Sequence, residues 1–153
     1  MRDTSSDQHH AGWLVEARPS DQLLVVALRR WLDGPDGQQA VRTGLSGQIG
    51  AAKTRSLLDA FEAFLYALAE GLSRRLTRHT ALCPSIGQDE RLLTEIVRAA
   101  GEGDYETAHA HAQGVVRAAD RAIVLERAAH LGSLLDDMGL EPVSGTEARA
   151  RLH

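Results

Sequence analysis

The sequence predicts an all-α fold, a compact bundle of five to six helices. Alanine and leucine recur along the whole chain while aromatic residues make up only 4% of it, and this composition favours helices over strands. Apolar residues also recur three or four positions apart, which is the spacing of one face of an α-helix. At 153 residues the chain is long enough for one domain with its own apolar core.

The strongest helical pattern lies in residues 51–76, which we expect to form a long central helix. Its apolar positions alternate three and four apart, as one face of a helix requires. They are Leu58, Phe61, Leu65, Leu68 and Leu72.

Two shorter helices are expected before the central one. Leu24, Leu28 and Trp31 predict a helix that begins near Ser20 and ends at the DGPDG sequence of residues 33–37. From Asp36 onward, Val41, Leu45 and Ile49 predict either a weaker helix or a frayed helix or broken turn, because three glycines interrupt it and each costs roughly 0.5–1 kcal/mol relative to alanine. These glycines are Gly44, Gly47 and Gly50.

Residues 88–119 predict a helical hairpin. Its first helix ends near residue 100, and the sequence GEGD then turns the chain so that Asp104 can cap the second helix. The apolar stripe of 105–119 and that of 124–138 differ by about 90° when plotted at about 100° per residue. Residues 104–138 therefore form either two helices or one long helix with different partners along its length.

The expected organisation is a flexible N-terminal tail over residues 1–18, a single helical domain over 19–140 and a loose C-terminal tail over 141–153. The N-terminal residues are polar where a signal peptide would be basic and then apolar. No segment approaches the roughly 20 apolar residues of a membrane-spanning helix. A single cysteine forms no internal disulfide, so a cytoplasmic location without membrane attachment is expected.

The charge of the chain argues against a nucleic-acid partner. Its formal net charge is −4, whereas nucleic-acid-binding modules usually carry a basic face. A helix-turn-helix made from the hairpin would also bring Asp104 and Glu106 toward the phosphates. We therefore expect no nucleic acid among the partners.

The scarce residue types gather in the sequence HTALCPSIGQDE of residues 79–90. His79 and Cys83 would share a face if the helix continued through them, and together with Asp89 and Glu90 they form a candidate site for zinc. The pair resembles the first half of the H-x3-C-x2-C motif of zinc-binding anti-sigma factors. The position of the last cysteine is occupied here by Ile86.

Three other interpretations of these residues stay open. Cys83 and Pro84 resemble the Cys-Pro pair through which some regulatory proteins bind haem. Asp89 and Glu90 are also favourable in the first turn of a helix, because the helix dipole attracts negative charge there. Cys83 is otherwise a small buried apolar residue, as free cysteine commonly is.

No catalytic arrangement is evident in the sequence. There is no glycine-rich phosphate loop and no G-x-S-x-G sequence. Glu106 and His109 have the i, i+3 spacing of di-iron bundles, but the second such pair is missing.

The sequence thus predicts a small cytoplasmic helical module for protein interaction or regulation, without enzymatic activity. The central helix and the glycine-containing helix before it would offer a face to a protein partner or to a second copy, since small residues let helices approach closely. The alternative function is a sensor or regulator that responds to a metal or to haem through His79 and Cys83.

Overall fold

The computed structural model describes residues 10–140 and confirms the all-α prediction. Within these residues the helices are α2 (Pro19–Trp31), α3 (Pro35–Ile49), α4 (Ala51–Gly71), α5 (Gln88–Gly101), α6 (Tyr105–Gln113) and α7 (Arg121–Asp137). Short 3-10 turns, η1 (Leu14–Glu16) and η2 (Ala118–Asp120), precede α2 and α7. None of the helices in this part of the chain combines the length and apolar character that crossing a bilayer requires.

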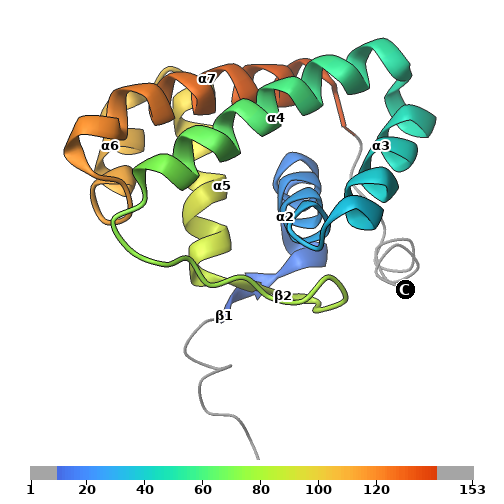
Figure 1. Cartoon of the computed structure of the whole chain (residues 1–153), viewed down its shortest axis with the longest axis horizontal. Helices are drawn as coiled ribbons and strands as arrows, with labels where there is room; N and C mark the ends of the chain where they lie inside the picture. The colour runs from blue at the N-terminus through green and yellow to red at the C-terminus, as the bar shows by residue number, and fades with distance from the viewer. Residues whose placement is uncertain (1–9, 141–153) are drawn as a thin grey trace, which may run out of the picture.

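The helices surround one apolar core. Figure 1 shows α4 and α7 side by side along one edge of the molecule, with α5 and α2 beneath them and α3 and α6 at opposite ends. The core is mainly aliphatic; its aromatic members are Phe64 and the pair Trp31 and Phe61, whose rings meet edge-on with centroids 5.6 Å apart. Because the side chains come from every helix, the described part of the chain has one continuous main core.

The predicted central helix is α4, and it ends at Gly71 rather than at residue 76. Leu72 is extended and forms an isolated bridge with Val116. The backbone of the α6–α7 connection also donates to and accepts from this end: Arg117 N–H donates to the Gly71 carbonyl and Ser73 N–H to that of Val115. These tertiary hydrogen bonds replace the helical ones that the apolar spacing predicted beyond residue 71.

The question left open for residues 104–138 is answered by two helices. The hairpin turn is as predicted, since the Asp104 carboxylate accepts from the Thr107 N–H at 3.2 Å and lies at the N-cap of α6. However, α6 ends at Gln113 and not near residue 119. A connection through η2 then separates α6 from α7, which accounts for the change in the direction of the apolar stripe.

A small antiparallel sheet was not predicted. Its strands are β1 (His10–Trp13) and β2 (Ser85–Gly87), paired with His10 opposite Gly87 and Trp13 opposite Ser85. Leu14 and Ile86 pack with Val25 of α2 in a second, smaller apolar cluster beside the sheet. The packed part of the chain therefore begins before residue 19, whereas residues 1–9 and 141–153 of the expected tails lie outside the described residues.

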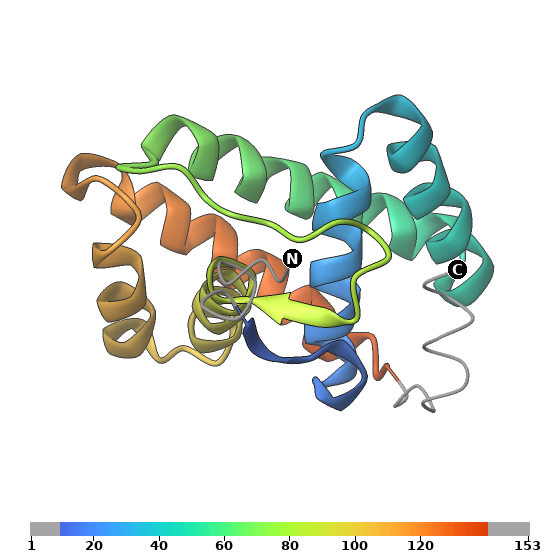
Figure 2. The same ribbon diagram turned by 90° about the horizontal axis from the view of Figure 1, so that it is seen from below.

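A long connection without helix or strand joins α4 to β2. Figure 2, seen from below, shows it crossing from the end of α4 to the sheet, beside α2 and α5. This connection contains His79 and Cys83 of the predicted site. Its position depends on side chains of α2 and α5.

Candidate functional site

Helix α2 contacts other parts of the molecule on three sides. At about 100° per residue, Leu24, Arg29 and Arg30 point in three directions that are roughly 120° apart, and each represents one row of side chains along the helix. Leu24 stands in the row that faces the main core, Arg29 in the row that faces the sheet, and Arg30 in the row that faces α3. The second and third rows form the two regions of functional interest.

The row toward the sheet contains a fully buried ion pair. The Arg29 guanidinium donates to both carboxylate oxygens of Glu90 at 2.7 and 2.8 Å, and both side chains are 0% exposed. It also donates to the carbonyls of Cys83 at 2.6 Å and Ser85 at 2.7 Å. Glu90 in turn accepts from the Gly87 N–H at 2.9 Å. Arg29 therefore fixes the connection and β2 to the start of α5. All the acceptors of its guanidinium named here are groups of the protein itself.

A second carboxylate, Asp89, fixes the earlier part of the same connection. It accepts from the Arg74 guanidinium at 2.7 Å and from the N–H and hydroxyl of Thr77 at 2.7 and 3.1 Å. The hydrogen bond from Arg74, with those from Thr77 and the charge of the guanidinium, holds the pKa of Asp89 below its ordinary value against the effect of its burial. Asp89 is thus an acceptor whose charge is already compensated.

His79 and Cys83 are brought together on this connection. The Cys83 Sγ lies 3.4 Å from His79 Nδ1, and both residues are partly exposed. A tetrahedral zinc ion with bonds of about 2.3 Å to sulfur and 2.0 Å to nitrogen would place two such atoms about 3.5 Å apart, so the spacing suits a shared metal. Nδ1 also lies 2.9 Å from the carbonyl oxygen of Ser85. Because a carbonyl only accepts, Nδ1 carries the proton here, and metal binding through Nδ1 would require its loss.

The four predicted metal ligands do not meet at one point. Among residues 10–140 no group of three or more His, Cys, Asp or Glu side chains is placed to hold a metal ion. Asp89 and Glu90 have the structural role that was considered for the first turn of α5, and Ile86, at the place of the missing cysteine, is 0% exposed in the smaller apolar cluster. The metal prediction thus stands on His79 and Cys83 alone. Glu106 and His109 are both exposed on α6.

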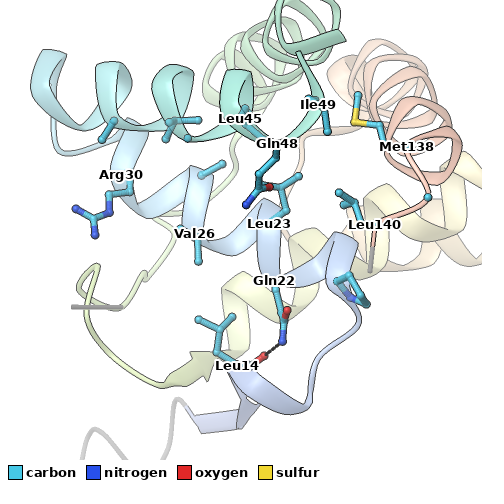
Figure 3. A pocket seen from close by; sticks show the side chains of 16 residues that line it. Leu14, Gln22, Leu23, Val26, Arg30, Leu45, Gln48, Ile49, Met138 and Leu140 are labelled. Atoms are coloured by element: carbon cyan, nitrogen blue, oxygen red, sulfur yellow. Dashed lines mark hydrogen bonds between the residues drawn. The ribbon is translucent and has the colours of Figure 1, made fainter. Parts of the chain in front are cut away.

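The third row of α2 borders a groove that reasoning from the sequence missed. The groove has a volume of about 560 Å³ and runs between α2 and α3, and residues of η1 and residues after α7 also line it. Figure 3 shows Arg30 at one end and Met138 and Leu140 at the other. Its apolar lining consists of Leu14, Pro19, Leu23, Val26, Ala27, Ala40, Val41, Gly44, Leu45, Ile49, Met138, Gly139 and Leu140.

The groove contains few polar groups. Its remaining lining residues are Gln22, Gln48 and Arg30, so the described lining includes no acidic and no aromatic side chain. The Gln22 amide donates to the Leu14 carbonyl at 2.9 Å (Figure 3). In contrast, the Arg30 guanidinium has no hydrogen bond or ion pair with any residue that the structure describes.

Small side chains leave this space open. Gly44 is on the groove side of α3, and a Cβ added there would meet nothing within 4 Å. Ala27 and Ala40 also line the groove. A signal for the groove existed in the sequence, because Leu23 and Val26 fall outside the stripe of Leu24, Leu28 and Trp31 that was used to predict the helix. Apolar residues on a second side of a helix indicate a second contact surface.

Comparisons with protein-family models, with curated proteins and with solved structures find no match to this chain.

Proposed function

We propose that this chain is a non-enzymatic binding module with a regulatory role, and that the groove between α2 and α3 is its binding surface. One observation carries the proposal: a concave apolar surface of about 560 Å³, at whose end the Arg30 guanidinium has no hydrogen bond or ion pair with a described residue. Pockets for small ligands commonly measure roughly 300–1,000 Å³, are mainly apolar and contain a few polar groups that orient the ligand.

The local packing supports a role in binding. Leu23, Val26 and Ile49 are only partly buried, although apolar side chains of their size favour full burial. An occupant that covers them would gain roughly 25 cal/mol for each Å² of apolar surface removed from water. The expected protein partner or second copy remains a prediction, and the exposed glycines Gly44 and Gly47 on α3 support it because they permit close approach.

The proposal is tested with Nile red, a neutral dye that fluoresces in apolar surroundings. We expect the full chain to bind it saturably in a 1:1 ratio, and we expect Gly44→Leu to remove this binding because leucine fills the groove. Gly47→Leu is the matched control, since its Cβ also meets nothing within 4 Å and it does not line the groove. Equal dye binding by both variants and the wild type would refute the groove as the binding surface.

The second candidate function is a regulator that responds to a metal or to haem, and the observation that favours it is the distance of 3.4 Å between Cys83 Sγ and His79 Nδ1. Such a site would use two protein ligands and complete its coordination from outside the described residues. Zinc binding would release the proton of the Cys83 thiol to solvent and require the His79 proton to stand on Nε2 instead of Nδ1.

Metal analysis of the untagged full chain distinguishes the two functions. A regulator of this type should retain close to one equivalent of zinc or haem after purification and dialysis, and Cys83→Ser should lose it. Less than about 0.2 equivalents in the wild type would exclude this candidate without affecting the groove.

A further inference from the structure

The aliphatic character of the groove limits what can fill it. Its described lining is made of Leu, Ile, Val, Ala, Pro, Met and Gly, with no Phe, Tyr or Trp on which a flat ring could stack. Arg30 stands on α2 eleven residues after Pro19, so the helix gives the groove a length of about 16 Å. A narrow, flexible hydrocarbon chain fits these walls better than a planar aromatic ligand does.

The positive charge of Arg30 at one end of the groove indicates which chemical group one end of the ligand should carry. Arg30 is the one charged residue of the described lining, it is partly buried, and its guanidinium has no partner within the described residues. A guanidinium without a partner among the described residues can attract an anion, and its planar donors match a carboxylate in two parallel hydrogen bonds. A single negative charge would be balanced by this arginine, whereas a doubly charged phosphate would leave one charge without a partner.

We propose that the groove binds a long-chain aliphatic carboxylate, with the hydrocarbon chain lying between α2 and α3 and the carboxylate on Arg30. This inference rests on the proposed function, because it requires the groove to be the binding surface. It adds the chemical class of the ligand and assigns Arg30 as the residue that selects it.

The experiment uses dodecanoate below its micelle concentration, titrated calorimetrically into the full chain. We expect 1:1 binding that is about tenfold tighter than that of dodecanol, which has the same chain without the charge; a factor of ten corresponds to the net gain of one hydrogen-bonded charge pair. Arg30→Gln should abolish this preference and leave dodecanol binding unchanged. Arg30→Lys should keep part of it, because the charge remains and the planar donors are lost.

Two further measurements complete the test. Gly44→Leu should prevent dodecanoate binding while Gly47→Leu retains it. In a ¹⁵N correlation spectrum, the amide signals of Arg30 and Gly44 should shift on addition of dodecanoate. Binding that persists in Gly44→Leu, or that is equally tight for dodecyltrimethylammonium, would overturn the inference.

The outcomes separate the ligand class from the function. If Nile red binds in a Gly44-dependent way and dodecanoate does not displace it, the groove is a binding surface but its ligand is not an aliphatic carboxylate. If an apolar helical peptide displaces the dye where dodecanoate fails, the occupant is a protein segment and the inference is wrong. If neither the dye nor dodecanoate binds, both proposals fail.

Discussion

Arg29 and Arg30 are neighbours in the sequence, yet they belong to two regions of opposite character. Arg29 is 0% exposed and donates to Glu90 and to two carbonyls of the α4–β2 connection. Arg30 lies about 100° further around α2, at the end of an open apolar groove, without a described partner. The difference teaches that an arginine has a structural role where the protein supplies its acceptors, whereas the described residues supply none to Arg30, on which our proposal of a ligand rests.

The same contrast extends to the surroundings of the two residues. On the side of Arg29, the connection, β2 and the start of α5 are joined by charged hydrogen bonds. On the side of Arg30, small residues of α2 and α3 leave space between the helices. Substitutions on the first side should therefore change stability, and those on the second should change binding.

The largest effect is expected for Arg29→Met. It leaves the buried Glu90 carboxylate without its cation, and removal of one partner of a buried ion pair typically costs about 3–5 kcal/mol. Urea unfolding followed by circular dichroism measures the loss. Adding Glu90→Leu should restore part of the stability, because the uncompensated charge is gone, while the hydrogen bonds from Arg29 to the Cys83 and Ser85 carbonyls stay lost. A free energy of unfolding within about 0.5 kcal/mol of the wild type for Arg29→Met would contradict the structural role of the pair.

A smaller loss of stability is expected for Asp89→Asn. This substitution tests the hydrogen bonds that hold the same α4–β2 connection closer to the surface. It should cost about 1.5 kcal/mol at pH 7, at the lower end for charged hydrogen bonds because Arg74 is 45% exposed. The pKa of Asp89 is lowered in the folded protein, so its contribution is complete above the unfolded pKa of about 3.9 and is lost as the pH falls through the lower folded value.

Urea unfolding at pH 7 and pH 3 checks this sign. The gap between wild type and Asp89→Asn should narrow at the lower pH. A gap that is constant over this range would show that the ionised form of Asp89 does not contribute.

On the open side, Gly44→Leu and Gly47→Leu should both raise the free energy of unfolding by about 0.5–1 kcal/mol, because leucine is a much better helix former than glycine and neither site is crowded. The gain should be larger for Gly44→Leu, whose side chain also covers apolar groove residues. Thermal and urea unfolding measure both. A clear loss for Gly44→Leu alone would mean that the space beside α3 is not open.

The smallest effect on stability is expected for Arg30→Gln. Its guanidinium has no described partner, so the free energy of unfolding should remain within about 0.5 kcal/mol of the wild type. Comparison with Arg29→Met in the same urea series gives the sharpest form of the contrast. A loss of more than about 1 kcal/mol would indicate a structural partner for Arg30 and would weaken its assignment to a ligand.

The sequence determined the helical class and most helix positions, because the three- and four-residue spacing of apolar side chains is a local property of the chain. The stripe of Leu58, Phe61 and Leu68 gave α4, and Asp104 gave the start of α6. Local spacing predicted the end of α4 less well. Leu72 continues the stripe, but the backbone of its neighbours Gly71 and Ser73 is hydrogen-bonded to the α6–α7 connection, which is more than 40 residues away.

The roles of individual polar residues were decided by the tertiary structure alone. Nothing in the sequence distinguishes Arg29 from Arg30, or assigns Asp89 to Arg74 and Glu90 to Arg29, because these partners come from different segments. His79 and Cys83 were expected to be close if a helix continued through them, but they meet in a connection without helix, and the proton on Nδ1 depends on the Ser85 carbonyl. Side-chain periodicity fixes which residues face inward, whereas the charge that each buried group meets is set by the packing of distant segments.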